Sequence, residues 1–298
     1  MKRIKKVFVE TFTNFLYDFN MILDFIGSKI PIFESDRPFR FFFDIFILIY
    51  LILLISNIFL KFSFSLNRQI YNNALWIIFE ILPPYIFCFE VLLNLNTSYY
   101  SKGMFVSQRS RIINHYLKNC IWLDFITILP LIFIANNYGE IEIILILRLK
   151  DLDNILRRLE EYLQLKGKKE GIYQLIKLIL SLLFLAHVCA CVWHYIGIYE
   201  ISSGIMDNWI TVNNIEYTDW FIRYIYSFYF SIVTMMTVGY GDIAANNYIE
   251  CTFSIILIIY GCGVFAYSIN NIGNIFKEMY QDDKDFKYSF VCFLKNFN

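Results

Sequence analysis

The sequence predicts an all-α integral membrane protein with six transmembrane helices and a shorter re-entrant helix between the fifth and the sixth. Of the 298 residues, 58% are hydrophobic, 19% are aromatic and only 17% are charged, a composition too apolar for a soluble domain of this size. Apolar runs long enough to span a bilayer recur along the chain, whereas the run at 224–236 is too short to cross. The apolar composition predicts a lipid bilayer as the surroundings of this chain, and the formal net charge of zero suggests no nucleic-acid partner.

These runs divide the chain into two domains with short connecting segments. A four-helix domain at 39–164 has spans at 39–60, 74–95, 120–135 and 141–163, and a second domain at 172–276 has spans at 172–199 and 246–267. We expect a kink in the second span, where Pro83 and Pro84 interrupt it. The remaining segments are an N-terminal arm at 1–38, a linker at 165–171 and a tail at 277–298.

Lysine and arginine concentrate in the arm, in the loop between the second and third spans, in the linker and in the tail. Basic residues in short loops favour the cytoplasmic side of a membrane. The pattern therefore predicts a multi-pass protein with both termini cytoplasmic, and we expect it in the plasma membrane. The acidic loop after the fifth span then faces outside, where it either concentrates cations or serves only as a solvated turn.

Between the re-entrant helix and the sixth span, residues 234–242 read Thr-Met-Met-Thr-Val-Gly-Tyr-Gly-Asp. This run resembles the selectivity filter of potassium channels, in which backbone carbonyls replace the water shell of the ion. The resemblance assigns the filter to Thr237, Val238, Gly239, Tyr240 and Gly241, with potassium bound at the first four. Successive carbonyls all point inward only where strand alternation is broken, and the two glycines permit the positive φ that this requires.

A glycine turn between two apolar segments is the alternative interpretation of this loop. A helix too short to span, followed by the loop and by a full span, favours a pore module. Because one chain supplies one wall of such a pore, the resemblance implies a homotetramer or a heterotetramer with related subunits. No cofactor is expected beyond the permeant potassium ion.

Two further runs extend the resemblance to about residues 30–280. The run 90–102 begins Glu-Val-Leu-Leu-Asn-Leu-Asn-Thr, and 122–130 reads Trp-Leu-Asp-Phe-Ile-Thr-Ile-Leu-Pro. Both are similar to the ether-a-go-go, plant-type and protist potassium channels that usually carry a cyclic-nucleotide-binding domain. Because only a short tail follows the sixth span, we expect no cyclic nucleotide to bind here.

In such channels, an acidic residue of the second helix and an aspartate of the third pass arginines of the fourth helix through the membrane field. The matching acids are Glu90 and Asp124, and the candidate cations are Arg148, Lys150, Arg157 and Arg158. A static ion pair that only aids assembly is the alternative.

The fourth span predicts a weak voltage response. Counting in threes from Arg148 gives Asp151, Asn154 and Arg157, so an acid and an amide replace two expected cations. On this count Lys150 and Arg158 lie off the row, and Asp153 is positioned to pair with Arg157.

Residues around the filter and the sixth span complete the candidate site. In many potassium channels a tryptophan and a glutamate of the pore helix bond the filter tyrosine and the following aspartate; the matching residues here are Phe230 and Val233, which cannot. We expect Tyr240 and Asp242 to use other partners, such as water or a neighbouring subunit, and Thr234 to support the filter base. Gly261 and Gly263 are either a gate hinge or sites of close helix packing.

The sequence therefore predicts a passive, potassium-selective channel and no enzyme. A truncated regulatory subunit that assembles with full-length relatives, without conducting itself, is the competing hypothesis. His187, Cys191 and His194 share a helix face at a spacing that could bind zinc, although helix packing is the favoured interpretation.

Overall fold

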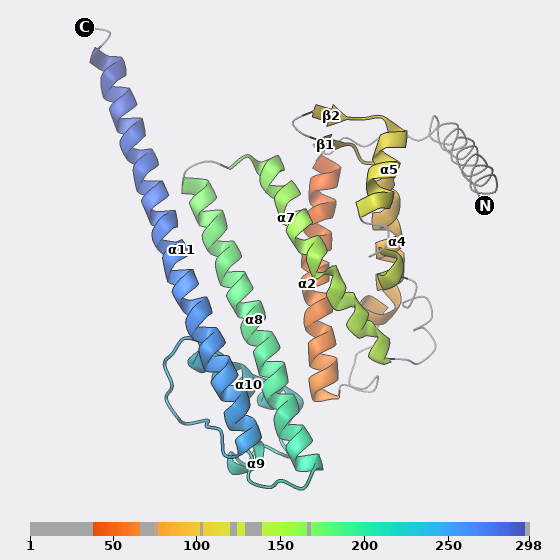
Figure 1. Cartoon of the computed structure of the whole chain (residues 1–298), viewed down its shortest axis with the longest axis vertical. Coiled ribbons are helices and arrows are strands. Elements are labelled where there is room, and N and C mark those ends of the chain that lie inside the picture. The colour runs from red at the N-terminus through yellow and green to blue at the C-terminus, as the bar shows by residue number, and fades with distance from the viewer. Residues whose placement is uncertain are drawn as a thin grey trace, which may run out of the picture. The chain divides into compact units, whose positions relative to one another are not determined.

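The computed structural model describes residues 38–65, 75, 77–101, 104–119, 124–128, 139–165 and 168–295. Helices dominate this part of the chain (Figure 1). In order, the elements are α2 (Pro38–Phe64), η1 (Ile77–Ile81), α4 (Leu82–Leu95), β1 (Tyr99–Ser101), β2 (Met104–Val106), α5 (Arg109–Asn119), η2 (Gly139–Arg148), α7 (Leu149–Leu163), α8 (Lys168–Ser202), α9 (Trp209–Val212), α10 (Trp220–Met235) and α11 (Tyr248–Lys295).

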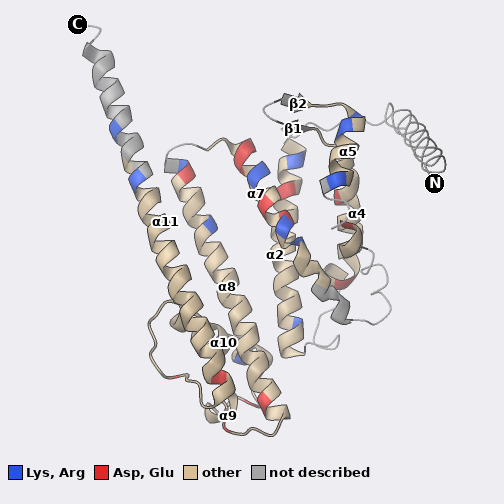
Figure 2. Ribbon diagram, viewed as in Figure 1, with Lys and Arg blue, Asp and Glu red and all other residues tan. Residues whose placement is uncertain are grey.

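Four helices among the described residues are long and apolar enough to cross a membrane, which supports the predicted multi-pass architecture. They are Pro38–Phe64, Ile77–Leu95, Lys169–Ser202 and Tyr248–Lys277, with mean hydropathy between 1.6 and 2.5. No charged residue interrupts α8 from Leu178 to Tyr199 (Figure 2). Most of the predicted third span lies outside the described residues, and the predicted fourth is built from η2 and α7.

The described chain forms two compact units. The first contains the residues up to Ile55 and from Leu75 to Tyr162, and the second contains Ser56–Ser65 and the residues from Leu163 onward. Helix α2 therefore contributes its last turns to the second unit. Each unit is described by itself below.

The first unit has a core of aliphatic side chains around one phenylalanine. Ile47, Leu51, Ile55 and Phe87 are completely buried. Pro83 and Pro84 lie in the first turn of α4, directly after the π-helical stretch Ile77–Ile81, and the kink expected at them stays a prediction. Proline is tolerated there, since its missing N–H has no partner in a first turn.

A small antiparallel hairpin, which the sequence analysis did not foresee, follows α4. Strands β1 and β2 pair Tyr99 with Val106 and Ser101 with Met104. The hairpin leads into α5, so the basic loop between the second and third spans is ordered secondary structure in the described residues.

The second unit packs α10 and α11 against α8. Trp193 and Trp209 are both completely buried, and their rings stack with centroids 5.6 Å apart. Helix α10 is 16 residues long, which corresponds to about 24 Å and is shorter than the hydrocarbon core of a bilayer, about 30 Å. Asp219 begins this helix by accepting a hydrogen bond from the Phe221 N–H.

Candidate functional site

The loop after α10 departs from strand geometry at every second residue. The φ angles of Thr237, Gly239 and Gly241 are 57°, 60° and 77°. The prediction of positive φ at the two glycines is confirmed. Thr237 was not expected there, because a β-branched side chain rarely adopts positive φ. This backbone meets the requirement stated above for carbonyls that do not alternate in direction.

Three backbone hydrogen bonds tie the start of the loop to the end of α10. The Thr237 N–H donates to the Thr234 carbonyl over 3.1 Å, and the Val238 and Gly239 N–H groups donate to the Val233 carbonyl over 2.9 and 3.4 Å. Val233 cannot support the filter through its side chain, but its carbonyl does so. These bonds place Thr234 and Val233 directly beneath the loop.

The outer end of the filter loop is tied to the same helix by a side chain that the sequence analysis missed. The Tyr229 hydroxyl donates a hydrogen bond to Asp242, 2.7 Å away. Asp242 therefore has a partner other than Phe230 and Val233, as expected, and this partner lies within its own chain. The pattern already held a signal, since Tyr229 precedes Phe230 on the helix that faces this loop. Phe230 stacks on Trp193, with centroids 4.0 Å apart.

Glu250, a second residue that the sequence analysis missed, anchors the segment that leaves the filter. Its carboxylate is completely buried and accepts hydrogen bonds from the Trp209 N–H, over 2.8 Å, and the Asn246 N–H, over 2.7 Å. The Asn247 side chain caps the first turn of α11 through the N–H groups of Ile249 and Glu250. A lone acid at the start of a long apolar span was the signal for it.

The two glycines of α11 lie in different surroundings. A Cβ at Gly261 would lie 2.9 Å from the Met235 Cα and 3.3 Å from the Met235 carbonyl oxygen, whereas a Cβ at Gly263 would have no atom within 4 Å. The helix continues through both positions. Close packing against the end of α10 therefore accounts for Gly261, and Gly263 has room for a side chain.

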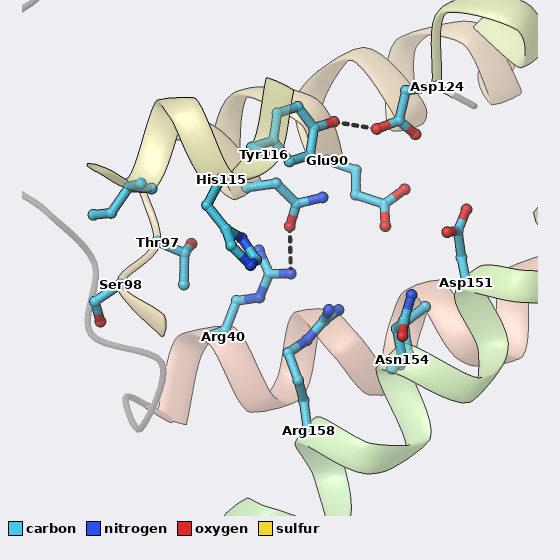
Figure 3. A pocket seen from close by; sticks show the side chains of 13 residues that line it. Arg40, Glu90, Thr97, Ser98, His115, Tyr116, Asp124, Asp151, Asn154 and Arg158 are labelled. Atoms are coloured by element: carbon cyan, nitrogen blue, oxygen red, sulfur yellow. Dashed lines mark hydrogen bonds between the residues drawn. The ribbon is translucent and has the colours of Figure 1, made fainter. Parts of the chain in front are cut away.

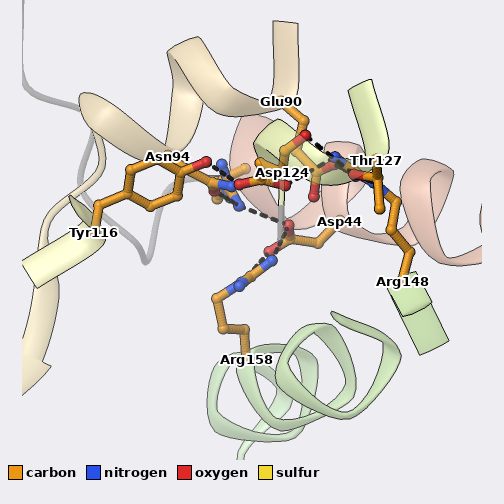
Figure 4. A network of polar contacts seen from close by, with 9 residues as sticks. Asp44, Glu90, Asn94, Tyr116, Asp124, Thr127, Arg148 and Arg158 are labelled. Carbon is orange, nitrogen blue, oxygen red and sulfur yellow. Dashed lines mark hydrogen bonds and ion pairs between the residues drawn. The ribbon is translucent and has the colours of Figure 1, made fainter. Parts of the chain in front are cut away.

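In the first unit, Arg148 lies in a seat made by the two predicted acids (Figure 4). Its guanidinium contacts Glu90 at 2.9 Å and Asp124 at 2.8 Å, and its Nε donates to the Thr127 hydroxyl over 2.9 Å. The same group lies 3.8 Å from the centroid of the Phe87 ring, a cation–π contact. Arg148 is 1% exposed. The Tyr116 hydroxyl donates to the other oxygen of Asp124.

A second group of ion pairs in the same unit joins Arg158, Asp44 and Arg40. Of these residues, the sequence analysis had named only Arg158. Arg158 contacts Asp44 of α2 through Nε at 3.0 Å and Nη2 at 2.9 Å. Arg40 contacts the same carboxylate at 3.1 Å and donates to the Asn94 side chain over 2.7 Å. Ionisable residues inside the first span were the available signal.

This geometry corrects the predicted row of cations. Helix type changes from 3₁₀ to α between Arg148 and Leu149, so counting in threes fails beyond Arg148. Nine α-helical residues turn the chain by about 900°, which points Arg157 about 180° away from Arg148. Arg157 is exposed and paired with Asp153, as its spacing predicted, and Lys150 is exposed as well. Arg158 faces the interior instead.

The proposed zinc-spaced residues of α8 contact other helices of the second unit. His187 lies 3.0 Å from the Tyr224 hydroxyl and 3.1 Å from the Ser56 carbonyl. His194 lies 3.1 Å from the Ser63 carbonyl. Both rings therefore take part in helix packing, and the described residues hold no group of three or more histidine, cysteine or acidic side chains arranged for a metal.

A short helix, a filter-like loop and a long span define a channel pore module, and a buried arginine between two acids defines a voltage-sensor-like unit. The comparisons agree with this class. Residues 38–284 match the ion transport protein family, and the chain belongs to that family.

The similar proteins are potassium channels from animals and plants. The chain is 25% identical over 244 residues to the human voltage-gated delayed rectifier potassium channel KCNH5, covering 70% of this chain and 24% of the human one. It is 27% identical over 227 residues to potassium channel KAT4 of Oryza sativa subsp. japonica, covering 71% and 37%. With potassium channel AKT1 of Arabidopsis thaliana it shares 28% over 200 residues, covering 63% and 22%. The chain thus spans well under half the length of these relatives.

Proposed function

We propose that the protein conducts potassium selectively and passively through a pore formed by four subunits. The observation that carries this proposal is the loop at 237–241, with positive φ at every second residue and with both ends bonded to α10. Such a backbone supports inward carbonyls, and potassium is proposed to bind between those of Thr237, Val238, Gly239 and Tyr240.

Four copies are proposed because one loop supplies one wall of an ion path. Val238 and Tyr240 are 51% and 72% exposed in the single chain, so the filter has side chains available for contact with other subunits. The subunits are either identical or related. The distribution of basic loops supports an orientation with both termini in the cytoplasm, and the plasma membrane is the proposed location.

The voltage response is proposed to be weak. Arg148 and Arg158 are the two cations of η2 and α7 that face buried acids, whereas Arg157 is neutralised by Asp153 and Lys150 is exposed. Asp151 lies between the two inward arginines and opposes their displacement in the field. Steep gating takes about three or four charges per subunit, more than this unit offers.

The reversal potential tests the conduction proposal. With the chain expressed alone, we expect it to follow the potassium gradient and to ignore exchange of sodium for a large organic cation. A channel that follows both gradients would contradict potassium selectivity. A chain silent alone, but able to change the currents of a related full-length channel on coexpression, would support the competing proposal of a regulatory subunit.

A further inference from the structure

Arg40 is a buried cation with donors that are not used. Its side chain is 3% exposed, and Nη2 makes its contacts with Asn94 and Asp44. Its Nε and Nη1 groups are buried and have no hydrogen-bond partner. Because a buried donor without an acceptor is costly, this arrangement points to a second acceptor that Arg40 meets in another position of the unit.

A cavity of about 170 Å³ gives Arg40 room to reach such an acceptor (Figure 3). Glu90 projects into it from α4, and Asp151, Asn154 and Arg158 line it from α7. Arg40 and Glu90 already act on each other electrostatically, although no hydrogen bond joins them. Within the described residues of α2, the buried side-chain donors without a partner are those of Arg40, and Arg40 lines the same cavity as Glu90.

The charges on α7 show why Glu90 needs this second cation. In the position seen, Arg148 forms ion pairs with both Glu90 and Asp124. If α7 is displaced and Arg148 leaves, the residues of α7 that line the cavity before Arg158 are an acid, an amide and an isoleucine. None of them can replace the lost cation, and a buried carboxylate without a partner is strongly destabilising.

We propose that Arg40 is a stationary substitute for a missing cation of the fourth helix: it pairs with Glu90 when Arg148 leaves its seat. Glu90 thus exchanges a moving partner for a fixed one, and Nε and Nη1 of Arg40 form the new bonds across the cavity. This inference rests on the proposed displacement of α7 by voltage, but it does not depend on conduction. It assigns a sensor role to a residue of the first span.

A double-mutant cycle followed by fluorescence tests the exchange. A dye on a cysteine introduced at Tyr138, shortly before η2, reports the position of the sensor under voltage clamp without any potassium current. We expect Arg40→Gln to lower the ratio of displaced to seated sensors by about tenfold or more, since the displaced position then leaves Glu90 unpaired. Arg40→Lys keeps the charge, and should lower the ratio less.

Glu90 and Asp124, the two acids that pair with Arg148, can each be replaced to give matched backgrounds for the Arg40→Gln substitution. In Glu90→Gln channels, Arg40→Gln should change the ratio of displaced to seated sensors little, because position 90 then carries no charge that Arg40 could pair with. In Asp124→Asn channels, Arg40→Gln should lower the same ratio as much as it does in the unmodified channel. Equal effects of Arg40→Gln in the Glu90→Gln and wild-type backgrounds would overturn the proposal, and so would a fluorescence signal that does not respond to voltage. A silent pore with a normal fluorescence cycle would contradict conduction alone.

Discussion

The Tyr229 hydroxyl donates a hydrogen bond to the Asp242 carboxylate over 2.7 Å and so joins the pore helix to the residue that follows the filter. This contact is solvent-exposed, so its contribution is that of an ordinary hydrogen bond, about 0.5–1.5 kcal/mol. It nevertheless connects the two segments whose separation would let the filter lose its shape.

Replacement of Tyr229 by phenylalanine removes only this hydroxyl. We expect filter inactivation to become faster by about 2- to 10-fold, the range that corresponds to the loss of one such bond. Macroscopic current decay in the variant measures it. Tyr226→Phe, on an exposed position of the same helix, is the control, and an equal effect of both variants would argue against a role for the bond.

Alanine at Gly239 or Gly241 should abolish selective current. A Cβ at either position meets no atom within 4 Å, but φ is 60° and 77°, so the penalty comes from the left-handed backbone, about 1–2 kcal/mol. The filter relieves it by turning its carbonyls. Gly204→Ala has the same kind of strain, with φ at 82° and open surroundings, and should leave the reversal potential unchanged. Normal selectivity in the filter variants would refute the assignment.

Alanine substitutions at the two glycines of the sixth span, Gly261 and Gly263, should have different effects on stability and opening. At Gly261 the new methyl group overlaps the backbone of Met235, and overpacking of this kind costs about 1–3 kcal/mol. We expect a lower melting temperature of the purified channel and fewer openings. Gly263→Ala should keep both properties. A hinge role predicts instead that Gly263→Ala alone reduces open probability at unchanged single-channel conductance.

Replacement of Glu250 by alanine should destabilise the outer part of the second unit. The N–H groups of Trp209 and Asn246 would both lose their acceptor, at about 1–3 kcal/mol for each group that stays buried. Thermal unfolding of the purified protein gives the measurement. Asp207→Ala removes an exposed acid from the neighbouring loop and serves as the control; indistinguishable melting temperatures would contradict the anchoring role.

The slope of the conductance–voltage curve should be shallow, with an effective charge of about one or two per subunit, since Arg148 and Arg158 are the two cations of η2 and α7 that face inward. Arginine at both Asp151 and Asn154 adds cations where the cavity borders Glu90 and Asp124, and should steepen the curve. An unmodified channel as steep as a strongly gated one would show that the charges of α7 have been counted wrongly.

The sequence by itself determined the long apolar helices, the positive φ of the glycines in the loop at 237–241 and the acids that hold Arg148. Each of these depends on local properties: the length of an apolar run, the φ freedom of glycine, and the high free energy of a charge inside a span. The re-entrant helix is an example, because its length alone excluded a full span.

Only the tertiary structure decided which side chains hold these elements in place. The partner of Asp242 depended on how α10 faces the loop. That Arg158, and not Arg157, faces the interior depended on where the 3₁₀ helix ends and the α-helix begins. Asp44 is far from Arg158 in the chain, as Asn94 is from Arg40, and the members of each pair meet only after packing. Partner choice follows from distances between elements, which a one-dimensional pattern does not contain, because the same charge pairs differently when its helix turns by one residue.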